Sequence, residues 1–325
     1  MMNNRRYLIS VIVVIEVLMF IMLVIMPLAI CSLFQRFNDN YEHQENVYLD
    51  PVKIPAKIKV LRTETNKVEK IDTEDYIKGV VACEMPSSFH EEALKAQAVA
   101  ARTYAVAAII DSDNYGNPKA HPRAPLCNTT HCQVYKDDVK IDDKVKTAVD
   151  DTEGQLLYYK GKLVKQALFH SSSGGFTENS EDVFAAAVPY LVSVESPYEE
   201  KATHKNEKTA LSIRDFSAKI KACYPDMDFG NITADSIKII ERSDGNSVSK
   251  IRIGNEVLSG RQVREALGLA SANFTVKADD KSITFTSNGS GHGVGMSQYG
   301  ADGMAREGYD YKKILSHYYS GTDIY

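Results

Sequence analysis

The feature that most limits what this chain can fold into is an apolar run near its start. Residues Tyr7 to Phe34 form a 28-residue stretch in which Glu16 is the only charge. About 20 consecutive apolar residues are enough to cross the hydrocarbon core of a bilayer as a helix. The run therefore predicts a single transmembrane helix over residues 7–34.

The charges beside this run predict its orientation. Arg5 and Arg6 precede it and only Arg36 follows closely, so the positive-inside bias places residues 1–6 in the cytoplasm as a short tail. A cleaved signal peptide is one alternative, but its apolar region spans about 7–15 residues and no A-x-A site follows here. A lipoprotein anchor at Cys31 is another, disfavoured by the bulky Ile30. We expect a single-pass cell membrane protein with its catalytic or binding portion extracytoplasmic.

The charge balance excludes one class of partner. The chain has 38 Lys+Arg against 43 Asp+Glu, a formal net charge of −5. Nucleic-acid-binding domains are usually basic, so we expect no nucleic-acid partner. Five cysteines in 325 residues are too few for a disulfide scaffold.

Beyond the apolar run, the polar residues 35–55 are predicted to be a linker. Residues 56–325 mix helical and strand patterns without a regular βαβ alternation, which favours the α+β class. We expect mixed helices and short antiparallel strands in one large extracytoplasmic unit of two subdomains.

Local signals predict individual elements. A strand begins at Ala56, and a helix capped by Thr73 ends before Pro86. A second helix of about six turns follows a capping box of Ser88 and Glu91. The other expected elements are strands within 155–169, 190–196, 236–242, 249–255 and 282–287, and helices near 211–222, 261–267 and 310–319.

Glu84 is the first candidate for chemistry. It ends the first expected helix among the apolar residues of VVACEMP. Apolar surroundings and the negative end of the helix dipole both disfavour an ionised carboxylate, so its pKa should be raised. A carboxylic acid that stays protonated near neutral pH can act as a general acid in glycoside cleavage. The alternative is a structural ion pair with Lys78 or Arg102.

Two cationic residues of the second helix have two interpretations. Lys95 and Arg102 are seven residues apart and therefore share a helix face. They are either a cationic, hydrogen-bonding wall beside Glu84, or ordinary surface charges with Glu91 and Lys95 as an i,i+4 pair.

A group of metal-ligand residues lies within twelve residues: His121, Cys127, His131 and Cys132. Two histidines and two cysteines can form a closed tetrahedral zinc site, although this spacing matches no standard finger. A Cys127–Cys132 disulfide is equally compatible with an extracytoplasmic location.

Two Gly-rich stretches, FHSSSGGFTENSEDVF and SNGSGHGVGMSQYGADGMA, carry further polar residues. They lack the G-x-x-x-x-G-K-[ST] pattern of a phosphate loop and the G-x-S-x-G elbow of a serine hydrolase. We interpret their glycines as positions where the backbone approaches a ligand or adopts positive φ.

These motifs together resemble one family. The segments VVACEMPSSFHEEALKAQAVAARTYAV, FHSSSGGFTENSEDVF, GRQVREALGL and GHGVGMSQYGADGMA are similar to the sporulation protein D and amidase-enhancer family over roughly residues 56–325. The resemblance implies a lytic transglycosylase that cleaves peptidoglycan glycan strands, preferably those without stem peptides, in engulfment during sporulation. It implies that Glu84 is the catalytic acid and that Lys95 and Arg102 line the glycan cleft.

The resemblance also implies a metal and partners. Clostridial members have a zinc site of histidine and cysteine ligands, which makes His121, Cys127, His131 and Cys132 the expected ligands of a structural zinc. No organic cofactor is expected. The implied partners are stage II sporulation protein P, an amidase and endopeptidase, and stage II sporulation protein M. The catalytic domain would lie between the mother-cell and forespore membranes. Candidates for sugar contact are His170, Ser172, Tyr190, His292 and Gln298.

The expected mechanism needs one carboxylate. A glycoside hydrolase uses two, whereas in a lytic transglycosylase the sugar's own C6 hydroxyl closes onto C1 and leaves a 1,6-anhydro-N-acetylmuramic acid end. No motif supplies an obvious second carboxylate, and Asp182 and Asp302 remain candidates.

The alternative function is a non-catalytic amidase enhancer or glycan-binding scaffold. A zinc-dependent hydrolase would need an open metal position.

Overall fold

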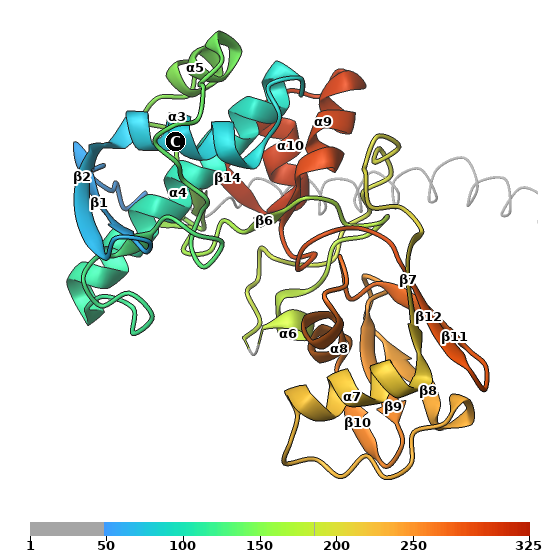
Figure 1. Ribbon diagram of the computed structural model, residues 1–325. Helices are drawn as coiled ribbons and strands as arrows, with labels where there is room; N and C mark the ends of the chain where they lie inside the picture. The colour runs from blue at the N-terminus through green and yellow to red at the C-terminus, as the bar shows by residue number, and fades with distance from the viewer. Residues whose placement is uncertain (1–48, 185) are drawn as a thin grey trace, which may run out of the picture. The chain divides into compact units, whose positions relative to one another are not determined.

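The computed structural model describes residues 49–325 with the exception of Ala185. The expected transmembrane helix over residues 7–34 and most of the expected linker lie outside these residues. The described residues contain eight α-helices, and their strands form five small sheets (Figure 1). This confirms a mixed class of helices and small, mainly antiparallel sheets. Two short pairings, β1 with β3 and β6 with β13, are parallel.

The first half of the described chain is mainly helical. It begins with a hairpin whose second strand leads directly into the first helix. Its elements are β1 (Lys57–Arg62), β2 (Lys67–Asp72), α3 (Thr73–Glu84), α4 (Glu91–Tyr115), β3 (Leu126–Cys127), α5 (Asp143–Asp150), β4 (Leu157–Tyr159), β5 (Lys162–Leu163), β6 (Phe169–His170) and α6 (Ser180–Val183).

The second half forms two three-stranded antiparallel sheets and then returns to the first half. Strand β14 pairs with β4, and β13 pairs with β6. The elements are β7 (Glu207–Ser212), α7 (Ile213–Cys223), the 3₁₀ turn η2 (Ala234–Ser236), β8 (Ile237–Arg242), β9 (Val248–Ile253), β10 (Glu256–Leu258), α8 (Gly260–Leu267), β11 (Phe274–Ala278), β12 (Ser282–Ser287), β13 (Met296–Ser297), α9 (Gln298–Arg306), α10 (Tyr311–Tyr318) and β14 (Thr322–Ile324).

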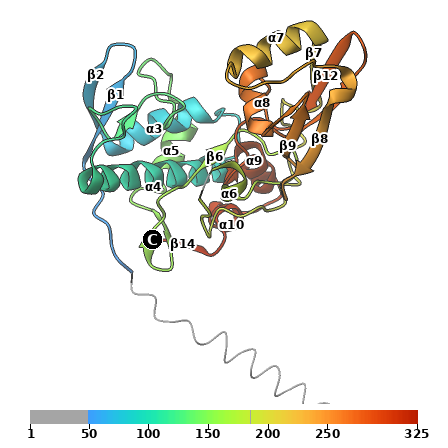
Figure 2. The same ribbon diagram turned by 90° about the horizontal axis from the view of Figure 1, so that it is seen from below.

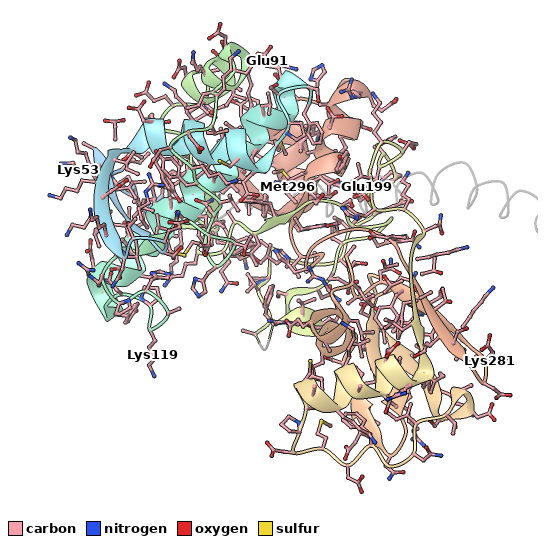
Figure 3. All side chains as sticks on the ribbon, viewed as in Figure 1. Lys53, Glu91, Lys119, Glu199, Lys281 and Met296 are labelled. Atoms are coloured by element: carbon pink, nitrogen blue, oxygen red, sulfur yellow. The ribbon has the colours of Figure 1, made fainter. Side chains whose placement is uncertain are left out.

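The buried apolar side chains form two main cores. The larger one joins β1, α3, α4 and α5 to β13, α9 and α10, and includes the fully buried Met296. The smaller one consists only of residues between Phe216 and Phe285. Met296 and Glu199 lie inside the molecule, whereas Lys119 and Lys281 extend into solvent (Figure 3). Residues 207–287 therefore have a core of their own.

Helix α4 is the central helix of the larger core. It is the one helix among residues 49–325 that is long and apolar enough to cross a membrane, yet 72% of its apolar window is buried. Its many alanines let α3, α5, α9 and α10 pack closely against it (Figure 2). The apolar sequence of α4 is thus explained by burial within the fold.

Several expected boundaries are confirmed and others are wrong. Helix α3 ends at Glu84, before Pro86, as expected, but its N-cap is Asp72, because the Asp72 carboxylate accepts the Glu74 N–H. The capping box of Ser88 and Glu91 does not form, since the His90 ring caps α4. Helix α4, expected to break at the segment DSDNYGNP (residues 111–118), continues to Tyr115 and ends at Gly116, which has a φ of 84°.

The strand expected at residues 190–196 is also wrong. This segment meets residues 175–179 through single contacts instead of a ladder. Thr177 N–H donates to the Val194 carbonyl at 2.9 Å, and Ser193 N–H donates to the Asn179 side chain at 2.8 Å. Backbone and side-chain acceptors thus alternate along this segment, and no continuous ladder forms.

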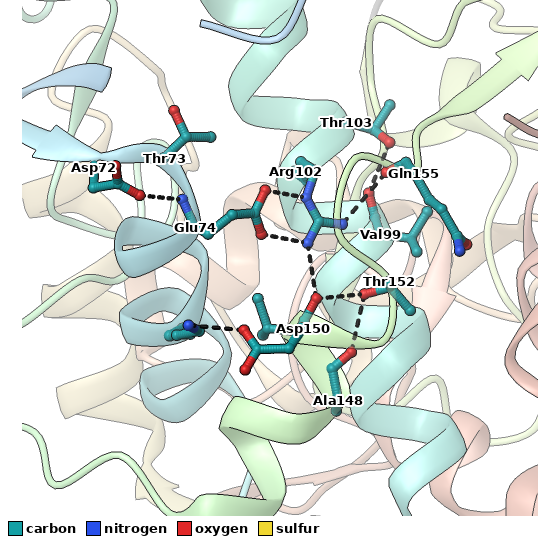
Figure 4. Close-up of polar contacts among 12 residues, drawn as sticks. Asp72, Thr73, Glu74, Val99, Arg102, Thr103, Ala148, Asp150, Thr152 and Gln155 are labelled. Atoms are coloured by element: carbon teal, nitrogen blue, oxygen red, sulfur yellow. Dashed lines mark hydrogen bonds and ion pairs between the residues drawn. The ribbon is translucent and has the colours of Figure 1, made fainter. Parts of the chain in front are cut away.

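A buried ion pair joins three helices of the larger core (Figure 4). The Arg102 side chain on α4 is fully buried and binds both carboxylate oxygens of Glu74 on α3, at 2.9 and 2.6 Å. Its remaining donors face the carbonyls of Gln155 at 3.4 Å and Val149, on α5, at 3.3 Å. Arg102 is therefore a structural residue of the helical core.

We predict that Arg102→Ala lowers the free energy of unfolding by about 3–5 kcal/mol, because it removes a fully buried side chain and leaves the largely buried Glu74 carboxylate without its partner. Urea unfolding of the purified chain measures this change. Lys250→Ala is the matched control, since the Lys250–Glu241 pair is more than half exposed and should contribute little. Equal, small effects of both substitutions would contradict the structural role of Arg102.

Candidate active site

Glu84 lies at the edge of a cavity of about 570 Å³. Pro86 ends α3 at this point, because Met85 must adopt an extended conformation, and this leaves the Glu84 side chain at the helix terminus. The cavity is lined by Glu84, Tyr104, Thr130, His131, Cys132, Ala167, Leu168, Phe169, Phe184, Arg261 and His292. Glu84 is the only carboxylate among these described lining residues.

The Glu84 carboxylate has no cationic partner among residues 49–325. Lys78 pairs with Asp150 at 2.8 Å, and Arg102 pairs with Glu74, so the expected alternative of a structural ion pair for Glu84 is wrong. Its Oε1 accepts a hydrogen bond from the Val134 N–H at 2.8 Å. Burial raises the pKa of Glu84 above its ordinary value of 4.5, and the hydrogen bonds from Val134 and Gln298 offset part of this shift.

Gln298 approaches Glu84 from the start of α9. The Gln298 side chain is buried, and its Nε2 donates to Oε1 of Gln97 on α4 at 3.4 Å. Ser297 caps α9 by accepting the Gly300 N–H at 3.1 Å. Gly300 must be glycine here, because a Cβ would lie 2.0 Å from the Tyr318 hydroxyl oxygen. Helices α3, α4 and α9 therefore converge on the carboxylate.

A buried carboxylate fixes the start of α9. Glu199 is only 5% exposed and accepts hydrogen bonds from the Ser297 hydroxyl at 2.5 Å and the Ser196 hydroxyl at 2.9 Å. It also accepts the backbone N–H groups of Ser173 at 3.0 Å and Gly174 at 2.9 Å. Glu199 thus binds the first Gly-rich stretch to the helix that carries Gln298. Neither its position nor its partners could be read from local sequence.

The four metal-ligand candidates converge beside this cavity. The ligand atoms of His121, Cys127, His131 and Cys132 all lie within 4.8 Å of one another. Cys132 Sγ is 3.2 Å from His121 Nε2 and 3.5 Å from His131 Nδ1. Cys127 and Cys132 are free thiols, so the disulfide alternative is not formed.

The donor set fits a tetrahedral zinc ion. It supplies two nitrogens and two sulfurs, the usual ligands of closed zinc sites. His121 Nδ1 lies 2.8 Å from the Ala124 carbonyl, and this hydrogen bond places the ring proton on Nδ1 and leaves Nε2 free as a ligand, as outer hydrogen bonds do for metal-binding histidines. These four residues could therefore hold a zinc ion.

The metal-ligand cluster and Glu84 share one chain segment. His131 and Cys132 line the Glu84 cavity, and Val134, two residues later, donates the hydrogen bond to Glu84. Interactions that hold residues 127–132 in place therefore also position the Val134 N–H, which orients the Glu84 carboxylate.

Lys95 and Arg102 do not form the expected wall beside Glu84. Neither lines the cavity. Lys95 binds Glu91 at 2.8 Å and Asp151 at 2.9 Å, and Arg102 is buried against Glu74. Both charges are paired with carboxylates. The i,i+4 pair of the alternative interpretation is present, but the surface position that it gave Arg102 is wrong, because this side chain is fully buried.

Of the five sugar-contact candidates, His292 lines the Glu84 cavity and Gln298 lies beside Glu84, whereas the other three are buried and are not among the lining residues. His170 Nδ1 faces the Val294 carbonyl at 3.2 Å, Ser172 pairs with the backbone of Ser290, and the Tyr190 hydroxyl accepts N–H groups of residues 165 and 166. Burial lowers the pKa of His170 to about 4 and that of His292 to about 3. Both rings are therefore neutral near pH 7.

The two carboxylates considered as a second catalytic group are elsewhere. Asp302 accepts the His90 N–H at 2.6 Å and pairs with Arg306 at 2.7 Å, so it has a structural role. Asp182 lines the neighbouring cavity.

The sequence does not indicate that Arg261 and Phe184 line the Glu84 cavity, although Arg261 belongs to the quoted GRQVREALGL segment.

Comparisons with known proteins agree on one family. A family model described as Stage II sporulation protein matches residues 61–159, which include Glu84 and all four metal-ligand candidates. Stage II sporulation protein D of Bacillus subtilis (strain 168) is 38% identical over 291 residues, which cover 86% of this chain and 81% of that protein. Stage II sporulation protein D of Bacillus amyloliquefaciens is 39% identical over 284 residues, or 83% and 79%. The amidase enhancer of Bacillus subtilis (strain 168) is 30% identical over 296 residues, or 76% of this chain and 40% of that protein.

The raised pKa of Glu84 leads to a prediction about stability. Well below pH 4.5 the carboxyl is protonated in both the folded and the unfolded chain. As the pH rises, the unfolded chain ionises first, so ionisation of Glu84 favours unfolding. Glu84→Gln should therefore be more stable than the unsubstituted chain near pH 7, and the difference should disappear as the pH falls below about 4.5.

Urea unfolding across this pH range tests the prediction, with Glu153→Gln, an exposed glutamate, as control. If Glu84→Gln is less stable than the unsubstituted chain at neutral pH, the fold stabilises the ionised carboxylate, and the prediction is wrong.

Proposed function

We propose, from the premise that this chain belongs to the stage II sporulation protein D family, that it is a peptidoglycan lytic transglycosylase with Glu84 as general acid and base. Family membership places the protein in sporulation. The observation that carries the activity is the half-buried Glu84, which has no cationic partner and is the only carboxylate among the described lining residues of the cavity at the end of α3.

In the first half of the reaction Glu84 acts as an acid. Burial raises its pKa, so a larger fraction of the carboxyl is protonated than for an exposed glutamate. This proton is transferred to the glycosidic oxygen as the bond between that oxygen and C1 of the N-acetylmuramic acid breaks. The Val134 N–H stabilises the resulting carboxylate and keeps it oriented.

In the second half Glu84 acts as a base. The C6 hydroxyl of the same sugar attacks C1, and its proton passes to Glu84, which returns to the acid form. The product is a 1,6-anhydro-N-acetylmuramic acid end, and no water is consumed. The mechanism needs no second carboxylate to activate water. This agrees with the cavity, where Glu84 is the only carboxylate among the described lining residues.

The form of the site suits a polymer. Two further cavities, of about 580 and 530 Å³, share residues with the Glu84 cavity, and Phe184 lines all three. The result is an extended groove with Glu84 in its middle part. We propose glycan strands without stem peptides as the substrate, and the membrane anchor over residues 7–34 as the attachment to the cell membrane.

We also propose that His121, Cys127, His131 and Cys132 bind a structural zinc ion. Four protein ligands leave no open position, so the ion would supply a cross-link and no catalytic chemistry. The cross-link would hold residues 127–134 and thereby the Val134 N–H that binds Glu84. As partners in engulfment we propose stage II sporulation proteins P and M.

A second candidate function is a non-catalytic amidase enhancer. The similarity to a protein with that name over 76% of this chain supports it. An enhancer would bind glycan or amidase without cleaving glycan, and it would gain nothing from an acid isolated in the groove. Cleavage assays separate the two functions.

We predict that Glu84→Gln abolishes cleavage of peptide-free glycan strands while the fold is retained, because the amide cannot donate a proton as an acid does. Mass spectrometry of the products should show fragments about 18 Da lighter than hydrolysis products, owing to ring closure without water. Glu153→Gln is the matched exposed control and should cleave normally. Undiminished turnover by Glu84→Gln would end the catalytic assignment, and glycan binding without any cleavage would favour the enhancer function.

We predict that Cys127→Ser lowers the bound zinc and the melting temperature together, since the loss of one thiolate weakens the closed site. Metal analysis and thermal unfolding measure the two effects. Cys223→Ser removes an exposed thiol outside the cluster and serves as control. An unsubstituted chain that contains no zinc and melts at the same temperature with and without a chelator would contradict the zinc proposal.

A further inference from the structure

The cavity next to the Glu84 cavity contains a partly buried guanidinium. Arg264, on α8, is partly buried, and its Nε donates to the carbonyls of Leu269 at 3.3 Å and Ala270 at 3.1 Å. Among residues 49–325 apart from Ala185, no carboxylate pairs with Arg264. A partly buried cation without a paired carboxylate lowers the stability of the fold, because no counter-charge offsets its loss of hydration. Burial accordingly lowers the pKa of Arg264.

Arg264 lines the cavity that adjoins the Glu84 cavity. This adjoining cavity has a volume of about 580 Å³ and shares Thr130, Phe184, Arg261 and His292 with the Glu84 cavity. A ligand in one can therefore extend into the other. Arg261 lies at the junction, where its guanidinium is 5.7 Å from the centre of the Phe184 ring and donates to the Val183 carbonyl at 3.2 Å.

The carboxylates in the same cavity do not neutralise Arg264. Glu265 pairs with Arg261 at 2.9 Å, and Asp182 accepts a hydrogen bond from Asn179 at 3.1 Å. Glu178 accepts the Ser247 N–H at 3.1 Å, and its other oxygen is buried without a partner. Burial raises the pKa of Glu178, which favours its neutral form. The guanidinium of Arg264 thus remains available to an anion from outside the chain.

We propose that Arg264, with Arg261 at the junction, forms a carboxylate-binding subsite of the glycan groove. The inference rests on the proposed function, because it takes peptidoglycan as the ligand. Guanidinium groups bind carboxylates through paired, charge-assisted hydrogen bonds. Peptidoglycan offers two sources of carboxylate near its muramic acid: the lactyl group, which is free when the stem peptide has been removed, and the carboxylates of the stem peptide itself.

The subsite gives the groove a way to select substrate. A site built to bind a charged group discriminates strongly against an analogue that lacks it, because the site's own polar groups are then left unpaired. If the lactyl group is the ligand, a free carboxylate favours binding and an amide-linked peptide opposes it. If the peptide is the ligand, the preference is reversed.

The experiment uses the full chain in detergent, with Glu84→Gln as background so that binding is measured without cleavage. Three glycan oligomers of equal length are compared: one with free lactyl carboxylates, one with lactyl carboxamides, and one with stem peptides. We expect the carboxylate form to bind about 10- to 100-fold more tightly than the carboxamide form. Arg264→Gln should remove this difference, chiefly by weakening the binding of the carboxylate form.

The controls keep the test decisive. Arg252→Gln changes an exposed arginine of β9 outside the groove and should preserve the preference. Arg264→Lys retains the charge and should restore part of it. The comparison of carboxylate and carboxamide forms in the unsubstituted groove needs no Arg264 variant, so it remains informative even if Arg264→Gln unfolds.

Equal binding of the carboxylate and carboxamide forms, together with no preference for the peptide form, would overturn the subsite. A preference for the peptide form that Arg264→Gln removes would support the subsite and identify the peptide as its ligand. Failure of the proposed function is a separate result, because it is seen as absence of cleavage by the chain that retains Glu84, whatever the binding preference.

Discussion

The site depends on keeping the Glu84 carboxylate half-buried with no counter-charge among the residues that the structure describes. Glu84 has the Val134 N–H and the Gln298 amide as polar neighbours, and burial raises its pKa. A carboxylate in this condition costs stability when it ionises, so the surrounding elements must be held firmly by other interactions. Arg102 and Glu74 join α3 to α4, and Glu199 fixes the start of α9. The cationic residues nearby are neutralised by other acids, which leaves Glu84 with a raised pKa.

This arrangement separates stability from chemistry. The charged pairs of α4 stabilise the helical core, while the cavity at the end of α3 has Glu84 as the only carboxylate among its described lining residues. The cluster of His121, Cys127, His131 and Cys132 lies at the boundary between the two roles, because the segment that carries it also carries Val134. A zinc ion in that cluster would act on the reaction only through the position of this backbone N–H.

Local sequence predicted the features that depend on local physics. The end of α3 at Glu84 followed from Pro86, the raised pKa followed from apolar neighbours, and the four ligand residues were close enough in sequence to meet. The roles of Lys95 and Arg102 could not be predicted in the same way, because their partners Asp151 and Glu74 are distant in sequence and meet them only after packing. For the same reason α8 gave no sign that its arginines reach the groove. Residues 207–287 fold around their own core, and only the tertiary structure shows where they meet the site.

The central claim is that Glu84 cleaves glycan without water. It is tested most directly by finding the source of the oxygen that becomes bonded to C1 of the sugar after cleavage. Peptide-free glycan strands are cleaved in water enriched in heavy oxygen, and the new ends are analysed by mass spectrometry. Our account predicts that no heavy oxygen enters the products, because the C6 hydroxyl of the sugar supplies the oxygen that closes onto C1. One heavy oxygen atom at each new reducing end would show hydrolysis. That result would require a second carboxylate and would contradict the account.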